Sequence, residues 1–351
     1  MGLANIVELV IVGRFLIGIA SGLSTVAAPG YLGEIAPARI RGAIGSLHPI
    51  SLVFGIFMAQ VLGIPWFDAN NWRLLFGFGV ITTTIQFVGL IFCYDCPSFY
   101  IKQNDTNYAL ESYKTFNSPF NEEEFKKLSE ESRSFTHVSI PQLLRTKIAY
   151  RSLVINVLLQ MFLQFSGING VFFFSTIIFQ QAGNSDIATY VSMGLGLTNF
   201  LFTLSTVYFV EKFGRRSLLL VGTIGQALCS ILIVIFLNFS INVPFVIAIY
   251  FFIAFFAIGL GCIPWIITSD IFPPNAVPAA GSVSVTMNWV SNFIVAITFQ
   301  SMVGGLGRLF FLPYMGVLIV ASVFVYFMCR ETKGKTPGYI VNIVNQENEN
   351  A

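Results

Sequence analysis

Stretches of about 20 consecutive apolar residues recur along this chain, and they constrain its fold more than any other feature. A helix of that length spans the hydrocarbon core of a bilayer, whereas a transmembrane β-strand needs only about half as many residues. Charged residues make up 10% of the chain, against roughly 25% in soluble domains. The sequence therefore predicts an all-α polytopic membrane protein.

The apolar stretches predict nine transmembrane helices. They cover residues 6–28, 43–64, 74–92, 153–179, 189–210, 218–237, 244–268, 280–303 and 309–329. The spacing of Gly18 and Gly22 in the first of them predicts a close helix–helix contact. A polar, charged segment follows the third, and its Glu/Lys pattern predicts short helices on a membrane surface, with a flexible linker as the alternative. The predicted domains are an incomplete N-terminal half (1–93), a cytosolic linker (94–150), a six-helix half (151–335) and a cytosolic tail (336–351).

Lysine and arginine gather in alternate loops. Two lie in residues 37–41, eight in 94–151, three in 211–216 and three in 330–335. Loops rich in basic residues face the cytosol, so Met1 is expected on the outer side. The long basic segment separates three spans from six, and the halves of transporters are commonly equal. We therefore expect three further spans before Met1.

Polar side chains interrupt the apolar run of residues 153–179. Gln164 and Asn169 lie about 140° apart around a straight helix, so one straight helix cannot present both on the same face. Gly167, which lies between them, permits a break, and broken helices at the bilayer midplane form binding sites in transporters. The alternative is a hydrogen-bonded pair between helices, as amides often make in membrane bundles.

Two short turns combine an acid with arginines. Glu34 precedes Arg41 in the first turn, and Glu211 precedes Arg215 and Arg216 in the second. Partly desolvated Arg–carboxylate pairs are strong and directional, and such pairs can latch helix ends together in one state of a rocking carrier. The alternative is that these arginines only determine membrane topology. Because the pattern occurs twice, it favours the latch.

Seven strings, spread over nearly the whole chain, occur in the order and with the spacing of one family. They are GRFLIGIASGL, YLGEIAPARIRGAIGSLH, QFSGIN, EKFGRRS, GCIPW, NWVSNFIV and RETKGKT. The chain thus resembles a facilitative glucose transporter of the major facilitator superfamily. The resemblance implies a helical bundle of that superfamily with an incomplete N-terminal half, in which Met1 corresponds to a point just before the fourth of twelve helices.

The resemblance implies a sugar site and a cytosolic gate. The implied sugar-binding residues are Gln164, Asn169, Asn199, Gly261, Trp265, Asn288 and Asn292. Side-chain amides offer a donor and an acceptor to vicinal hydroxyls, and an indole offers an apolar face and an N–H group. The implied gate residues are Glu34, Arg41, Glu211, Arg215, Arg216 and Asp270.

Several family positions differ in this chain. A glutamine is replaced by Leu163 and another by Pro49, two tyrosines by Phe173 and Phe174, a glutamate by Ala257, and two arginines by Val277 and Ser98. The lost polar groups bear on the affinity and choice of sugar. The lost charges bear on the gate.

The resemblance implies facilitative (uniport) transport of a hexose, with glucose as the first expectation, by alternating access in the plasma membrane. The alternative is a truncated or diverged protein that binds sugar or partners without translocating. An intramembrane enzyme or receptor is disfavoured, because no nucleophile–base pair or metal constellation falls within the spans. We therefore predict a non-enzyme without cofactor or metal, whose partners are a hexose and the lipid bilayer and not nucleic acid. No carboxylate lies in the middle of any visible span, which argues against proton coupling in this portion. The resemblance implies that the helix that usually bears a coupling acid in proton symporters is among the three expected before Met1.

Overall fold

The computed structural model describes residues 2, 4, 6–36, 41–63, 72–116, 122–134, 138–145, 147–181, 188–273 and 275–335. The chain divides into two compact units, Met1–Leu52 with Val61–Thr136, and Val53–Gln60 with His137–Ala351. Every regular element within the described residues is a helix. The all-α architecture predicted from the apolar runs is therefore confirmed.

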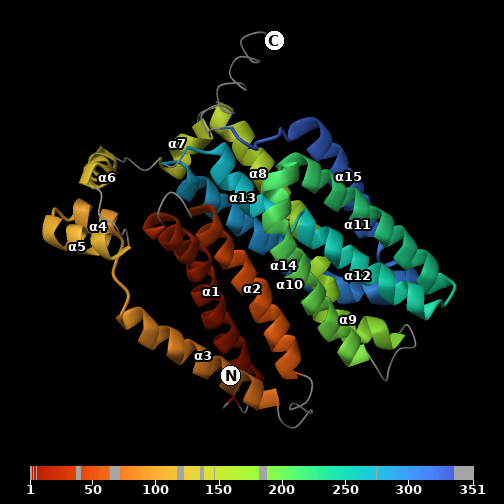
Figure 1. The fold of residues 1–351 in the computed structure, drawn as a ribbon. Helices are drawn as coiled ribbons and strands as arrows, with labels where there is room; N and C mark the ends of the chain where they lie inside the picture. The colour runs from red at the N-terminus through yellow and green to blue at the C-terminus, as the bar shows by residue number, and fades with distance from the viewer. Residues whose placement is uncertain are drawn as a thin grey trace. The chain divides into compact units, whose positions relative to one another are not determined.

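The first unit contains three long apolar helices followed by three shorter ones, except that residues Val53–Gln60 of the second long helix are grouped with the second unit (Figure 1). They are α1 (Val7–Ile35), α2 (Arg41–Gly63), α3 (Trp72–Ile91), α4 (Pro97–Lys102), α5 (Thr106–Phe116) and α6 (Glu122–Ser134). Ser112 on α5 donates a hydrogen bond to the backbone carbonyl of Asp95 (2.6 Å). The rings of Tyr113 and Phe125 lie 5.2 Å apart, so the polar stretch after α3 has a small core of its own.

The glycines of α1 do not make the close helix contact that their spacing predicts. A Cβ atom built on Gly18 or Gly22 would meet no atom of the described chain within 4 Å. The most apolar window of Val7–Leu32 is 0% buried. The predicted contact is therefore wrong within the first unit, where no described helix approaches Gly18 or Gly22 closely.

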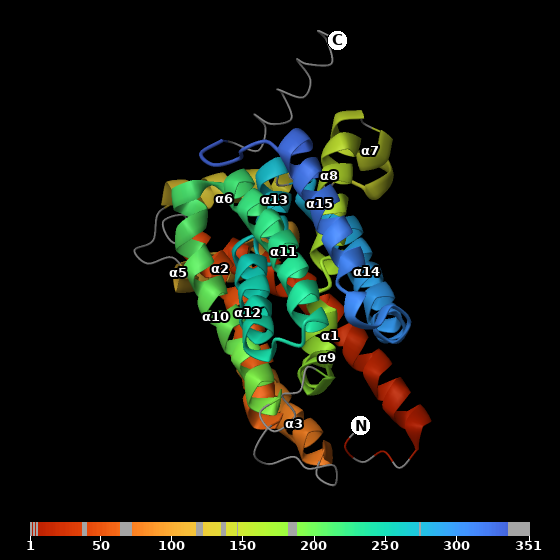
Figure 2. The ribbon, with the colours of Figure 1, turned by 90° about the vertical axis from the view of Figure 1, so that its right-hand side faces the viewer.

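The second unit contains the remaining helices. They are α7 (Ile140–Arg145), α8 (Lys147–Phe165), α9 (Ile168–Gln181), α10 (Ala188–Phe213), α11 (Arg215–Asn238), α12 (Asn242–Ile258), α13 (Ile263–Ile271), α14 (Val277–Leu306), a short 3-10 turn η1 (Gly307–Leu309) and α15 (Leu312–Met328). Figure 2 shows α11 between α12 and α15, and α11 packs against both. A second pairing joins α8 to α14.

Two of the predicted spans are broken helices. The first break, between α8 and α9, contains Gly167 with φ +85°, a conformation that a glycine adopts without steric cost. A Cβ atom at Gly167 would also come within 2.8 Å of the Tyr314 ring. The second break lies between α12 and α13, where Pro264 stands in the first turn of α13. Proline is tolerated there because its missing N–H has no helical partner in any case.

Aromatic rings form the centre of the second unit. Phe299 on α14 stacks on Phe174, with ring centroids 5.0 Å apart, and on Tyr314 at 6.0 Å. The ring of Phe310 packs edge-on against the Phe299 ring, with centroids 5.7 Å apart. Gly170 on α9 lies directly against Phe299. A larger residue there would displace the ring, so this glycine is a requirement of packing.

Helices long and apolar enough to cross a membrane occur in both units. Within the described residues seven helical stretches meet this criterion, and Leu47–Gly63 and Leu312–Met328 are shorter apolar helices. Together they correspond to the nine spans predicted from the sequence. The polar groups that these spans carry must then find partners inside the protein, because the hydrocarbon offers none.

Candidate functional site

Polar side chains four residues apart on α8 face polar side chains four residues apart on α14. Residues at this spacing share one face of a helix, and α8 and α14 pack against each other. We call the six side chains the polar ladder. They are Asn156, Gln160 and Gln164 on α8, and Ser284, Asn288 and Asn292 on α14.

Gln164 is the centre of the polar ladder. Its Nε2 donates to Asn288 Oδ1 (2.9 Å), and its Oε1 accepts from Asn292 Nδ2 (3.2 Å) and from Asn169 Nδ2. Gln164 is 4% exposed and Asn288 is 1% exposed. Asn169 belongs to α9, so the break at Gly167 brings it back to Gln164. Four of the residues predicted for the sugar site therefore meet in one hydrogen-bonded group.

The other three members of the polar ladder, Asn156 and Gln160 on α8 and Ser284 on α14, were not predicted from the sequence. Asn288 Nδ2 donates to Gln160 Oε1 (2.8 Å). One turn further back, Asn156 Nδ2 donates to Ser284 Oγ (2.8 Å) and to Thr268 Oγ1 (3.0 Å) on α13. The four-residue spacing of polar side chains within two apolar runs is the signal that would have found them.

Some buried polar atoms of the second unit, in the polar ladder and outside it, have no hydrogen-bond partner within the described residues. They include Gln160 Nε2, Ser291 Oγ on α14 and Asn199 Oδ1 on α10. Buried polar groups without a partner are rare, and each indicates an absent water, ion or ligand, or a site of strain. These atoms could therefore form hydrogen bonds with a ligand in addition to the bonds that the polar side chains make with one another.

The other three predicted sugar-binding residues are placed differently. Asn199 is 3% exposed on α10, Gly261 lies in the break between α12 and α13, and Trp265 lies on α13. Trp265 is partly buried against the hydrophobic core. In the part of the chain that the structure describes, no hydrogen bond joins these three residues to the polar ladder.

A second, charged group lies where α10, α13 and α15 end and α11 begins. Arg215 Nε donates to Asp270 Oδ2 (3.0 Å), and the Thr332 hydroxyl donates to the same oxygen (2.7 Å). Arg215 Nη2 is 3.6 Å from Glu211 Oε1, whose side chain is 75% exposed. We call Glu211, Arg215, Asp270, Glu331 and Thr332 the charged clasp. Three predicted gate residues belong to it.

Glu331 was not predicted, yet it caps α11. Its Oε1 accepts from the backbone N–H of Arg215 (2.8 Å) and its Oε2 from that of Arg216 (3.1 Å). A carboxylate at a helix N-terminus satisfies orphan donors and interacts favourably with the helix dipole. Gly214 has φ +84°, and a Cβ atom there would come within 2.5 Å of the Glu331 carboxyl carbon. Glycine is therefore required at this turn.

The side chain of Arg216, another predicted gate residue, bonds outside the charged clasp. Arg216 directs Nη2 to the backbone carbonyl of Tyr326 (2.7 Å) rather than to an acid. The side chains of Glu34 and Arg41 lie outside the described residues. No group of three or more potential metal-ligating side chains occurs among the residues that the structure describes.

Comparison with known proteins places the chain in one family. The sugar (and other) transporter family matches residues 1–340. The chain is 40% identical over 351 residues to human facilitated glucose transporter member 4 of solute carrier family 2, covering 96% of this chain and 69% of the relative. Member 1 from Gallus gallus is 37% identical, with 94% and 69% covered, and member 2 from Sus scrofa is 37% identical, with 93% and 65% covered. The chain thus spans about two thirds of the length of these relatives.

Solved structures show the same fold. The xylose transporter XylE from E. coli, in a partially occluded inward open conformation, matches with a TM-score of 0.77 at 25% identity, covering 91% of this chain and 70% of that one. The major facilitator superfamily proton:xylose symporter XylE bound to 6-bromo-6-deoxy-D-glucose matches with a TM-score of 0.74 at 24% identity, covering 93% and 72%. The family comprises transporters and not enzymes, as the sequence indicated. The chain is therefore an integral, multi-pass membrane protein that belongs to the sugar (and other) transporter family, and its resemblance to facilitative glucose transporters is confirmed.

Proposed function

We propose that this protein carries a hexose, glucose first among them, through the membrane by facilitated uniport, and that the polar ladder with Asn169 holds the sugar. The observation that carries the proposal is the bonding of Gln164, which joins amides of α8, α9 and α14 at a break in an apolar span. Uncharged amides suit a neutral polyol, because each offers a donor and an acceptor at once.

Sugar binding would use an exchange of hydrogen bonds. The amides around Gln164 bond one another, so a hexose hydroxyl would replace Asn292 or Asn169 as the partner of Gln164. The unpartnered atoms of Gln160, Asn199 and Ser291 offer further positions. Such an exchange leaves few buried groups unsatisfied with or without sugar, which keeps binding reversible.

The charged clasp would serve as the cytosolic gate of this carrier. Basic loops place these helix ends on the cytosolic side. Arg215 and Asp270 are 13% and 21% exposed, so their bond is strong enough to favour one state of alternating access and exposed enough to break. In this proposal residues 1–93 and 151–335 are the two halves of the carrier, joined by the segment 94–150, and the protein resides in the plasma membrane.

Uniport is favoured over proton symport by the chemistry of the polar ladder. The matched XylE structure is that of a proton:xylose symporter, whereas the curated relatives are named facilitated glucose transporters. The side chains that bond the Gln164 side chain within the described residues are neutral amides, and a neutral amide does not change its charge state near pH 7. Uptake that stays the same with and without an imposed pH gradient would support uniport.

A second candidate function is sugar or partner binding without translocation. The first unit favours it, because the most apolar windows of α1 and α3 are 0% buried within the described residues. Sugar binding together with absent flux in the same folded preparation would select this function.

Uptake of radiolabelled glucose into liposomes containing the purified chain tests the proposal. Asn288→Ala removes the acceptor of Gln164 and the donor to Gln160. We expect at least a tenfold loss of uptake, since a site built around hydroxyl hydrogen bonds leaves buried groups unpaired when one partner is lost. Asn238→Ala is the matched control, because the Asn238 side chain bonds only its own helix, at Val234 (2.8 Å). Equal uptake by both variants and the parent would remove the polar ladder from the sugar site.

A further inference from the structure

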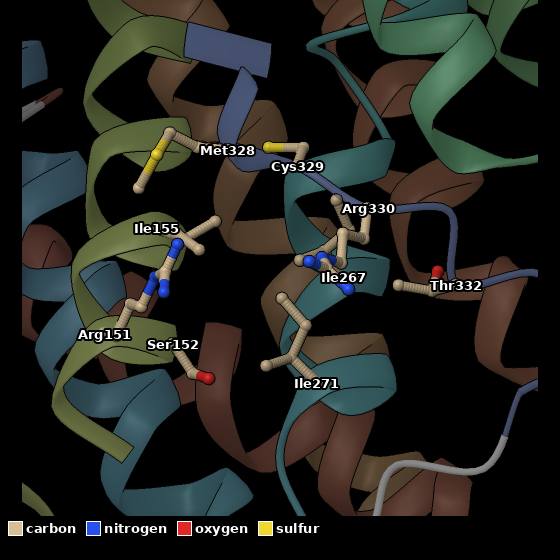
Figure 3. A pocket seen from close by; sticks show the side chains of 9 residues that line it. All are labelled: Arg151, Ser152, Ile155, Ile267, Ile271, Met328, Cys329, Arg330 and Thr332. Atoms are coloured by element: carbon tan, nitrogen blue, oxygen red, sulfur yellow. The ribbon is translucent and has the colours of Figure 1, made fainter. Parts of the chain in front are cut away.

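A pocket with a basic lining lies beside the charged clasp in the second unit. Figure 3 shows Arg151 and Ser152 of α8 on one side, and Arg330 and Thr332 of the segment after α15 on the other. The cavity measures about 40 Å³, whereas one water molecule needs only about 10–15 Å³ by the same measure. The pocket therefore has room for a group larger than water.

The lining of this pocket combines positive charge with an apolar wall. The two guanidinium groups come from segments far apart in the chain, and none of the nine lining residues is acidic. Ser152, which is 3% exposed, adds a hydroxyl that can donate. Ile155 of α8 and Ile267 of α13 form the apolar part. Arginine donors in a fork geometry match the oxygens of a phosphate.

We propose that this pocket binds a phosphate group, and that its usual source is the headgroup of an anionic phospholipid. Arg151 is the second residue of the membrane-spanning stretch Tyr150–Ser175, so the pocket lies at the membrane boundary. Basic pockets between transmembrane helices on the cytosolic side recognise anionic headgroups. The apolar wall then faces the glycerol and the first methylenes of the lipid.

The bound phosphate would act on the charged clasp through the segment that lines both. Thr332 lines the pocket and donates to Asp270, and Arg330 directly precedes Glu331, the cap of α11. A phosphate held between Arg151 and Arg330 would tie α8 to this segment. Anionic lipid would thereby stabilise the state in which the charged clasp is closed.

Binding of short-chain phosphatidic acid to the full chain in detergent tests the proposal independently of transport. Dioctanoyl phosphatidic acid is expected to raise the melting temperature saturably, as a ligand of the folded state does. Arg151→Gln and Arg330→Gln are each expected to weaken this binding by about tenfold, the effect of losing one charge-assisted contact. Arg145 is an exposed arginine in the last turn of the neighbouring α7 and lies outside the pocket lining, so Arg145→Gln removes the same charge and should leave binding unchanged.

Two further comparisons complete the experiment. Other phosphate ligands identify the source of the phosphate, and conservative variants distinguish lost binding from a misfolded variant. Glycerol 3-phosphate and inorganic phosphate carry the group without acyl chains, so binding as tight as that of the lipid would assign the pocket to soluble phosphates. Arg151→Lys and Arg330→Lys keep the charge and should retain more affinity than the Gln variants. Equal affinity of the parent and the Gln variants, an equal loss in Arg145→Gln, or no saturable binding of any of the three probes would overturn the proposal.

Discussion

The apolar helices of the two units are alike in sequence but differ in burial. The most apolar windows of α1 and α3 are 0% buried, whereas those of α11 and of the stretch Asn242–Ile271 are 61% buried. All of them are long and apolar enough to cross a membrane. The length of an apolar run therefore identifies a helix that can cross a bilayer. The packing of neighbouring helices then determines which residues of that helix are sensitive to substitution.

The polar side chains within the spans show the same difference. In the first unit Thr84 donates to the carbonyl of Val80 in its own helix (2.7 Å). In the second unit Thr268 on α13 donates to Asn156 Oδ1 on α8 (3.1 Å). A bond within one helix survives the separation of helices, whereas a bond between helices is lost. Substitutions of the same kind in the two units should therefore have unequal effects.

Gln164→Leu should give the largest loss of stability among such substitutions. The change leaves Asn169, Asn288 and Asn292 without their shared partner. Hydrogen bonds between membrane helices contribute about 0.6 kcal/mol each on average and up to about 1.7, so three of them predict a loss of about 2–3 kcal/mol. Gln86→Leu on α3 is the matched control, because Gln86 is exposed.

For these two variants we would measure the free energy of unfolding in detergent, with intrinsic tryptophan fluorescence as the signal that monitors unfolding. Gln86→Leu should leave it unchanged within about 0.5 kcal/mol, as exposed substitutions usually do. If Gln86→Leu were as damaging as Gln164→Leu, the difference in burial between the two units would not determine sensitivity.

Gly222→Ala and Gly22→Ala form the second pair. A Cβ atom on Gly222 would lie 2.7 Å from the Cα of Gly259, where backbone meets backbone and no side chain can move aside. Overpacking of this kind costs about 1–3 kcal/mol, whereas alanine at the open Gly22 should improve the helix by about 0.5–1 kcal/mol. Melting temperatures that shift in opposite directions would support the comparison, and a shift in the same direction would contradict it.

These glycines also show how far the sequence predicts packing. Gly18 and Gly22 have the spacing of a contact motif, yet the close contact in the described residues is between Gly222 and Gly259. Spacing shows that a helix can approach, but the partner depends on the tertiary arrangement. The spans were predictable because apolar length is itself the physical requirement for crossing a bilayer.

The candidate site was predictable only in part, and for a similar reason. Gln164 was found as a polar residue that interrupts an apolar run, and Asn288 through a string that resembles a family. Asn156 belongs to no such string, although its spacing from Gln164 on one face was visible. Glu331 caps Arg215 from 116 residues away, and no local pattern indicates that the segment after the last helix folds back onto an earlier turn.

Thr268→Val and Thr84→Val are expected to differ less than the preceding pairs. Valine has nearly the shape of threonine, so the change removes the hydroxyl without opening a cavity. Thr268 exchanges two hydrogen bonds with Asn156, and their loss should cost about 1 kcal/mol in the free energy of unfolding. Thr84→Val removes only a bond within α3 and should change stability by less than about 0.5 kcal/mol. Chemical denaturation of the two variants side by side measures the difference, and equal losses would contradict it.

Glu211→Ala should have the smallest effect on stability. It tests whether a residue is sensitive because it is buried or only because it lies in the second unit. Glu211 lies 3.6 Å from Arg215 with its side chain 75% exposed, whereas Asp270, at 3.0 Å from the same arginine, is 21% exposed. Solvent screens an exposed pair, so Glu211→Ala should cost less than about 0.5 kcal/mol. Asp270→Ala should cost about 1–2 kcal/mol, because the hydrogen bonds that Arg215 Nε and the Thr332 hydroxyl donate to Asp270 Oδ2 are both lost. Adding 0.5 M salt should abolish the Glu211 effect and leave most of the Asp270 effect. Losses of equal size would mean that position in the second unit, and not burial, makes a residue sensitive.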